Sequence, residues 1–277
     1  MKKEKTIKTA KTKVIGDGKN LCVLAICTLT QIQSQPYATH LQFAYRLAKD
    51  NPDWSFILFT PYRMQIARFR NMAAEAALNQ NAEYLMFIDD DAILIDYPDI
   101  FNRLKERDKH IIAPLMYIRG YPFDPMFFKY VRTKDVYIKG GVGLELYKDF
   151  KTDGKIQDDG LLPVAAIGCH VCLIKTEVFK NMEQPYFMTG MNNTEDVFFC
   201  MKCHDCIENI EIFIDTKLSV GHLLLPIWVN DYNVDILRKF YEELKLDVPF
   251  KFEQEYADFP PEMVTNELEK LGEDFEE

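Results

Sequence analysis

Long apolar runs are missing from this sequence of 277 residues. No stretch approaches the roughly 20 apolar residues that a membrane-spanning helix needs, and the first residues lack the hydrophobic stretch of a secretory signal. We therefore expect no membrane span and a cytoplasmic location, which is the host cytoplasm if the protein is viral. The apolar share of 48% is still enough to fill the core of one large α/β domain.

A strong positive charge is missing as well, since the formal net charge is −10. Residues 1–13 carry six Lys against one Glu, whereas residues 251–277 carry ten acidic residues against two Lys. The net charge therefore does not favour binding to the phosphates of duplex DNA, and only the Lys-rich start of the sequence favours such a partner. We predict a flexible basic arm over 1–20, one folded domain over 21–250 and an acidic tail over 251–277.

The cysteine count is odd, with seven cysteines in all, which argues for reduced thiols rather than a disulfide framework. The spacings Cys169-x-x-Cys172 and Cys200-x-x-Cys203-x-x-Cys206 raise a zinc hypothesis. The gap between these groups is longer than in a compact zinc ribbon, and "GCHVCLIKTEVF" has the pattern of a strand interior. Buried thiols are therefore the favoured interpretation, and zinc is the alternative.

Apolar runs of strand length alternate with segments of helical spacing in the first half of the chain. Because these strands are apolar on both faces, they predict a parallel sheet covered by helices on two sides, with the ligand beyond the carboxyl ends of the strands. Short strand-like pieces over 119–174 predict antiparallel or mixed additions. The expected strands are 21–29, 54–60, 84–88, 110–118 and 210–216, and the expected helices are 39–51, 63–81, 98–108, 175–182, 194–206 and 233–245.

The segment "YLMFIDDDAIL" (84–94) sets three consecutive aspartates directly after a buried strand. Magnesium and manganese are typically held by one or two carboxylates together with substrate phosphates. Asp89 and Asp91 are spaced so that both carboxylates face the same side, and Asp90 points elsewhere, to a backbone amide or a sugar hydroxyl. A solvated turn or a helix cap is the alternative. The position at the end of the third strand favours a metal site.

Three other segments carry candidate chemistry. His222 in "IDTKLSVGHL" can complete a cation site of carboxylates and imidazole, although a lone His is more often a hydrogen-bonded structural residue. Glu195 and Asp196 lie in the first turn of a predicted helix, where they either complement its dipole or supply a general base. Arg70 in "IARFRNMAAEAAL" is either solvated or a partner for a diphosphate.

In combination, these segments resemble the GT-A fold glycosyltransferases, and in particular the short, single-domain, family-2-like enzymes of bacteria and phages. The resemblance covers about residues 21–228 and includes "ICTL", "APLMYIRGYP", "AAIGCHVCLIKTEVF" and "QPYFM" in the order of the family. It implies an α/β fold with a Rossmann-like mixed sheet flanked by helices. It also implies a nucleotide-sugar site at the carboxyl ends of the strands, within a single catalytic domain over 21–250.

The resemblance also implies roles for particular residues. Asp89 and Asp91 match the Asp-x-Asp pair, and His222 matches the late histidine; these three are the implied ligands of Mn²⁺ or Mg²⁺. Asp196, with Glu195, matches the acidic pair in which inverting members place the catalytic base.

Donor binding is implied for a second set of residues. One departure from the family is Cys27, which stands where many members have Pro and leaves the contact to the nucleotide base unassigned. The residues implied in binding the nucleotide sugar are Thr28, Arg70, Asp89, Asp90 and Arg119.

The expected function is therefore metal-dependent transfer of a sugar from a nucleoside-diphosphate sugar, with a UDP-sugar favoured, to a hydroxyl acceptor on a glycan, protein or small molecule. Two alternatives remain: a phage-type DNA glycosyltransferase acting on hydroxylated bases, and an inactive sugar-nucleotide-binding module. A nucleotidyltransferase would need a Gly-rich phosphate loop, and "CTLTQIQSQPYATH" has no glycine. The sequence leaves open the acceptor, the stereochemistry and the oligomeric state.

Overall fold

A computed structural model of the chain describes residues 13–16, 18–28, 31–61, 64–132, 142–190, 193–224 and 227–243. Most of the expected basic arm over 1–20 and the whole acidic tail over 251–277 lie outside these residues, so both remain predictions. No helix in the described part of the chain is long and apolar enough to cross a membrane.

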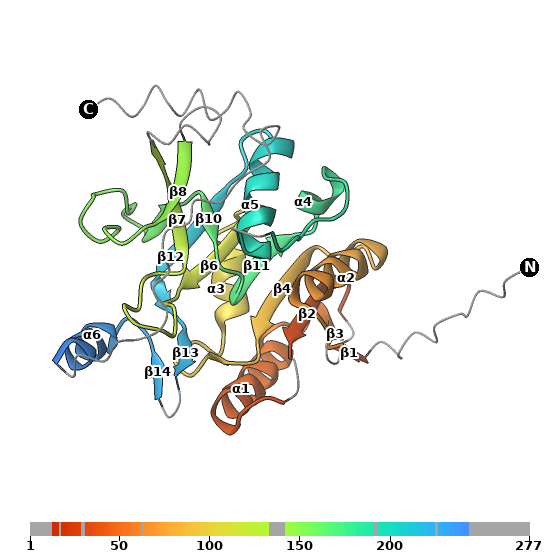
Figure 1. Ribbon diagram of the computed structural model, residues 1–277. Helices are drawn as coiled ribbons and strands as arrows, with labels where there is room; N and C mark the ends of the chain where they lie inside the picture. The colour runs from red at the N-terminus through yellow and green to blue at the C-terminus, as the bar shows by residue number, and fades with distance from the viewer. Residues whose placement is uncertain are drawn as a thin grey trace, which may run out of the picture.

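An eight-stranded sheet forms the centre of the molecule (Figure 1). In spatial order its strands are β1 (Lys13–Ile15), β3 (Trp54–Phe59), β2 (Asn20–Cys27), β4 (Tyr84–Asp89), β11 (Val171–Lys175), β6 (Ile111–Leu115), β12 (Ile212–Ser219) and β9 (Leu161–Pro163).

The sheet is mixed, as expected for the fold class. Strand β2 runs parallel to β3 and β4, and β12 runs parallel to β6. Strand β11 is antiparallel to both of its neighbours, β4 and β6. Of the antiparallel additions from the second half of the chain, β9 lies at an edge of the sheet, whereas β11 is inserted into its middle, and this insertion shapes the candidate site.

Two small sheets extend the central one. The first joins β10 (Ala166–Ile167), β7 (Phe127–Arg132) and β8 (Val142–Leu146). The second joins β14 (Ile227–Val229), β13 (Gly221–Leu224) and β5 (Ala92–Ile93). Because β5 follows the aspartates of β4 directly, the second small sheet ties the segment after β12 to the end of β4.

Helices cover both faces of the central sheet (Figure 1). Side chains alternate between the faces of a strand, so Tyr84 and Phe87 of β4 point to opposite sides. Phe87 packs against Phe69 of α2, whereas Tyr84 packs against Phe101 of α3. The helices are α1 (Ser34–Asp50), α2 (Ile66–Asn79), α3 (Ile100–Glu106), α4 (Glu177–Lys180), α5 (Glu195–Cys206) and α6 (Val234–Glu243).

The expected helices are all present, with shifted ends. Helix α1 begins at Ser34, ahead of the expected start at 39, and places Pro36 in its first turn, where the missing N–H costs nothing. Helix α4 is a single turn rather than the expected eight residues. The fold class predicted from the sequence, an α/β mixed sheet flanked by helices, is confirmed.

Candidate functional site

Strand β4 carries the aspartates to the carboxyl edge of the sheet. Its interior residues are buried, and burial falls at Asp89, which lies opposite Cys27 of β2. The next amide, of Asp90, donates to the Cys27 carbonyl at 3.1 Å. The aspartates therefore emerge where two parallel strands end side by side, which is the favoured place for a ligand in such a sheet.

The antiparallel insertion of β11 brings His170 against this edge. Val171 pairs with Ile88, so the residue before it lies beside Asp89, and the Asp89 amide donates to the His170 carbonyl at 2.8 Å. Within this arrangement His170 Nδ1 lies 3.4 Å from Asp89 Oδ2 and 3.4 Å from Asp91 Oδ1. His170 was assigned no role in the site from the sequence, and this position was missed.

The short β5–β13 pair brings the predicted histidine to the same place. His222 lies opposite Ala92, and the Leu223 amide donates to the Asp91 carbonyl at 3.0 Å. His222 Nε2 is 3.3 Å from Asp91 Oδ2, and its Nδ1 is 2.9 Å from the Tyr117 carbonyl. Because a carbonyl can only accept, the Nδ1–H of the ring donates to it, and Nε2 is left to face Asp91.

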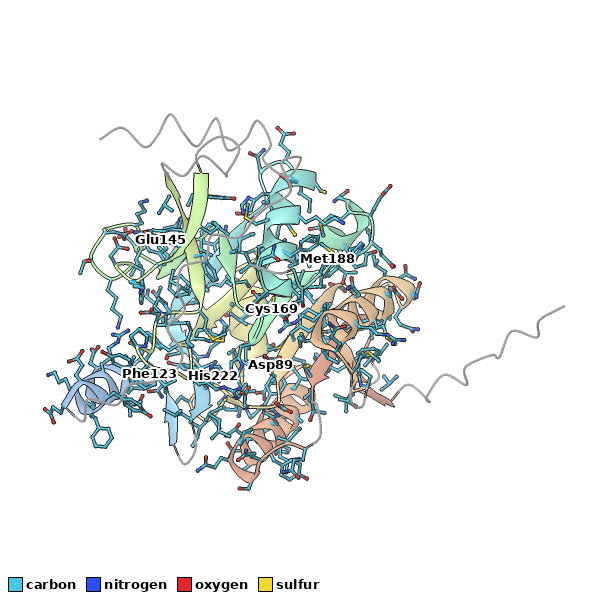
Figure 2. The ribbon with its side chains drawn as sticks, in the orientation of Figure 1. Asp89, Phe123, Glu145, Cys169, Met188 and His222 are labelled. Atoms are coloured by element: carbon cyan, nitrogen blue, oxygen red, sulfur yellow. The ribbon has the colours of Figure 1, made fainter. Side chains whose placement is uncertain are left out.

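Three side chains form a group that could hold a metal ion. The ligand atoms of Asp91, His170 and His222 all lie within 4.8 Å of one another. Their donor chemistry, one carboxylate and two imidazoles, fits a divalent cation. Asp91 and His222 were both predicted as ligands and lie together here, whereas His170 joins them unpredicted. Asp89 stands beside the group, and its role as a ligand remains a prediction (Figure 2).

The charges in this group are strongly coupled. Burial alone would lower the pKa of His170, but a hydrogen bond with Asp89 and the charges of Asp89 and Asp91 raise it. Burial would raise the pKa of Asp91, but a hydrogen bond with His222 and the positive charges around the carboxylate hold it well below its usual range. Burial and the neighbouring charge of His170 lower the pKa of His222. The pKa values of His170 and His222 are therefore shifted in opposite directions by this group of charges.

Other polar groups at this edge are open to a ligand. Arg119 Nη1 lies 2.8 Å from Asp91 Oδ2, yet its side chain is 62% exposed, so this predicted donor-binding residue lies at the site and is free to meet solvent or substrate. Within the described residues, the buried atoms Thr28 Oγ1 and Asp89 Oδ1 have no hydrogen-bond partner. A buried polar atom without a partner costs free energy, so these two atoms are natural contacts for a bound polar molecule.

Arg70 is buried beside Asp89 at this edge of the sheet, and its role in donor binding remains a prediction. The sequence suggested a guanidinium facing a diphosphate, but Arg70 is only 3% exposed. Its Nε lies 3.0 Å from Glu195 Oε1, its Nη1 donates to the Cys169 carbonyl at 2.9 Å, and its Nη2 lies 3.7 Å from Asp89 Oδ1. The helical spacing of α2 turns Arg70 inward, so it links protein groups to one another.

The predicted acidic pair lies at the start of α5 and takes two orientations. Glu195 is 7% exposed and faces Arg70, and burial raises its pKa against the opposing charge of Arg70. Asp196 is half-buried; its Oδ1 accepts from the Val197 amide at 2.8 Å and from the Thr194 hydroxyl, and its Oδ2 accepts from the Cys169 amide at 3.3 Å.

A single turn connects the two halves of the site. The Cys169 amide faces Asp196, its carbonyl receives Arg70, and the next residue, His170, faces Asp89 and Asp91. Figure 2 shows Cys169 and Asp89 in this region, with His222 nearby on β13. The acidic pair of α5 and the candidate metal ligands are therefore joined by one stretch of backbone.

The cysteines take the favoured interpretation rather than the zinc alternative. All seven are free, and Cys169, Cys172, Cys200 and Cys203 are fully buried. Burial raises the pKa of the Cys200 and Cys203 thiols, which favours the neutral form over the thiolate that zinc needs. Among the described residues, the group able to hold a metal is the Asp91 and histidine set, and it contains no cysteine.

A separate groove of about 640 Å³ lies between α2 and the segment 184–189. Its lining includes Arg68, Met72 and Met188, and it shares no residue with the metal-compatible group. We therefore place the chemistry at the strand ends rather than in this groove.

No family profile and no curated protein matches the sequence. Among solved structures, the chain is similar to A197 from STIV, with 18% identity and a TM-score of 0.45 over 73% of this chain and 85% of that one. It is also similar to GalNAc-T7 with UDP, GalNAc and Mn²⁺, with 11% identity and a TM-score of 0.44 over 73% of this chain and 43% of that one. A UDP-glucose pyrophosphorylase complexed with UDP-glucose follows, with 7% identity and a TM-score of 0.39 over 81% and 99%. Because these scores are low, the likenesses carry no argument about activity.

Proposed function

We propose that the protein is a metal-dependent glycosyltransferase that moves a sugar from a nucleoside-diphosphate sugar to a hydroxyl acceptor. One observation carries this proposal: a carboxylate and two imidazoles converge at the carboxyl edge of the sheet and share the Cys169–His170 turn with the acidic pair of α5. Such an arrangement can hold a cation on one side and place a carboxylate for proton transfer on the other.

The donor side would use the groups at the ends of β2 and β4. Asp91, His170 and His222 are suited to hold Mn²⁺ or Mg²⁺. When bound, the metal acts as a Lewis acid that neutralises charge on the leaving diphosphate. Thr28 Oγ1 and Asp89 Oδ1, which have no hydrogen-bond partner among the described residues, would form hydrogen bonds with the nucleotide sugar.

Two further residues complete the proposed donor side. Exposed Arg119 would add positive charge beside the phosphates, since guanidinium groups bind phosphate oxygens well. Asp90, whose amide is fixed by the Cys27 carbonyl, remains a predicted contact to the donor.

The acceptor side would use Asp196. In an inverting reaction a carboxylate must accept the proton of the attacking hydroxyl, and half-buried Asp196 is the better placed of the two acids. Glu195 is tied to Arg70, so we assign it a positioning role: through Arg70 it fixes the Cys169 carbonyl and the turn that carries His170.

The Asp91→Ala variant tests the proposal. We expect this change to lower kcat/KM for donor hydrolysis and for transfer by at least about 100-fold, because a lost ligand removes charge stabilisation worth several kcal/mol. The substrates are a panel of UDP-, GDP- and dTDP-sugars with Mn²⁺, with nucleotide release as the readout and calorimetric titration for binding. The matched control is Asp235→Ala, which removes an aspartate whose side chain is 74% exposed on α6.

Two outcomes would contradict this function. Undiminished turnover by Asp91→Ala after metal removal would show that the centre does not take part. Tight binding of a sugar nucleotide by the wild-type chain, without turnover under any acceptor tried, would instead support the inactive binding module.

A further inference from the structure

We propose that His170 is a protein ligand of the metal centre and makes the centre selective for transition-metal ions over Mg²⁺. This inference rests on the metal centre of the proposed function but not on glycosyl transfer itself. It adds to the predicted ligand set a residue from the turn before β11, and it distinguishes between the two cations that the sequence left open.

The geometry places His170 among the ligands. Its Nδ1 lies 3.4 Å from an oxygen of Asp91, and the His222 Nε2 lies 3.3 Å from the other oxygen of the same carboxylate. The centroids of the two rings are 4.2 Å apart and their planes are tilted by 34°. Two imidazoles thus present one nitrogen each to a single carboxylate, and a cation bound there would meet both nitrogens and an oxygen.

The surrounding protein fixes this arrangement. Burial leaves His170 only 2% exposed, and its carbonyl is held by the Asp89 amide at 2.8 Å. The His222 Nδ1–H donates to the Tyr117 carbonyl at 2.9 Å, which leaves Nε2 as the ligand atom. Hydrogen bonds of this kind are the usual means by which proteins orient metal-binding histidines.

The composition of this set determines which metal it prefers. Mg²⁺ is a hard ion that favours oxygen ligands, keeps several waters and is usually bound by one or two carboxylates. Imidazole nitrogen suits the later first-row metals, whose affinities for nitrogen sites rise from Mn²⁺ towards Co²⁺ and Ni²⁺. Two nitrogens and one oxygen therefore favour Co²⁺ and Mn²⁺ over Mg²⁺, and removing one nitrogen should weaken that preference.

A competing role for His170 is that of a fixed positive charge. An imidazolium between Asp89 and Asp91 would neutralise the carboxylates without any metal. The two roles differ in their response to metal: a ligand sets the preference among metals, whereas a fixed charge affects every cation in the same direction.

The experiment measures metal binding directly, in the purified full chain freed of metal by a chelator and with no donor present. Titration calorimetry with CoCl₂, MnCl₂ and MgCl₂ should show wild-type affinities for Co²⁺ and Mn²⁺ that exceed the affinity for Mg²⁺ by at least about 10-fold. In His170→Asn the affinity for Co²⁺ should fall by at least about 10-fold while that for Mg²⁺ stays unchanged. The visible absorption of bound Co²⁺, which responds to nitrogen ligands, should change in the same variant.

The control variant is His204→Asn, which alters a histidine of α5 that contacts the Ala165 carbonyl and lies outside the metal group. Circular dichroism and the melting temperature of the metal-free proteins establish that each variant is folded. His170→Gln serves as a second variant if His170→Asn does not fold.

Two results would overturn the inference. One is a parallel change, or no change, in the affinities for Co²⁺ and Mg²⁺ in His170→Asn. The other is a wild-type chain that binds Mg²⁺ as tightly as Co²⁺. Selective metal binding without any donor turnover would contradict the proposed function alone, so the two failures are distinguishable.

Discussion

At the scale of single residues, Arg70 shows how burial changes the role of a charged side chain. It is buried among Glu195, Asp89 and the Cys169 carbonyl, and its guanidinium lies over the Phe87 ring with 5.0 Å to the centroid. A buried ion pair adds little net stability over an apolar pair, but removal of one partner leaves the other charge buried and alone. Arg70 is therefore needed because Glu195 is present.

Stability measurements can test this dependence. We expect Arg70→Met to lower the free energy of unfolding by about 3–5 kcal/mol, because Glu195 would lose its partner at 7% exposure. The double variant Arg70→Met/Glu195→Gln should be more stable than Arg70→Met alone, since the unpaired charge is gone. Urea denaturation measures both. Exposed Arg68→Met on the same helix is the matched control and should change stability by less than about 0.5 kcal/mol.

At the scale of elements, α1 braces the strand that follows the aspartates. The Leu94 amide donates to Thr39 Oγ1 at 3.2 Å, and His40 Nε2 lies 3.0 Å from the Ala92 carbonyl. Two adjacent residues of one helix thus contact the first residue of β5 and the residue that follows the strand. Because β5 pairs with β13, which carries His222, these contacts of α1 also help to position a residue of the candidate metal centre.

This brace predicts a pH dependence of stability. Burial, helped by the charge of His170, lowers the pKa of His40 from the ordinary 6.5 to about 4, against the opposing Ala92 hydrogen bond and the charge of Asp91. Between pH 6.5 and about 4, the His40 ring is protonated in the unfolded chain but stays neutral in the folded chain. The contribution of the neutral ring is therefore complete above pH about 6.5 and is lost as the pH falls towards 4, by about 3 kcal/mol at most.

The His40→Gln variant isolates this effect, because its amide keeps a donor for the Ala92 carbonyl but does not titrate. We expect the free energy of unfolding of the metal-free variant to fall less steeply between pH 6.5 and 4 than that of the wild type. Urea denaturation at constant ionic strength across this range gives both curves. Parallel curves would show that His40 is protonated as readily in the folded chain as in the unfolded one.

At the scale of the whole molecule, the net charge affects which class of acceptor the protein can bind. The net charge of −10 opposes the approach of a polyanion, even though the Lys-rich start of the sequence could act locally. We therefore expect acceptor binding to vary little with salt, as for a neutral glycan. A DNA acceptor would instead give a log–log slope of roughly −0.9 for each phosphate neutralised. Binding of candidate acceptors measured from about 50 to 200 mM salt separates the two, because binding to DNA would weaken by orders of magnitude over this range.

Much of this architecture could be read from the sequence, because it depends on local patterns. The strand of 84–89 is apolar on both faces, and Phe87 and Tyr84 find helices on opposite sides, as the alternation with helices predicted. Asp91 and His222 were correctly expected to lie together at the end of that strand. Apolar periodicity and the placement of acids after a strand are properties of short segments, so they are visible without the fold.

The rest was decided by pairings between distant segments. Strand β11 is inserted antiparallel between β4 and β6, and only its register, with Val171 opposite Ile88, puts His170 beside Asp89 and Asp91. A one-residue shift would turn every side chain of the strand to the other face. The inward direction of Arg70 likewise depends on what packs over α2.

The sequence by itself determined the class of fold, the acidic strand end and its late histidine, because local patterns carry that information. Tertiary structure decided that a second histidine joins them and that the arginine supports the site from within, because those contacts exist only once segments 79 or more residues apart are paired.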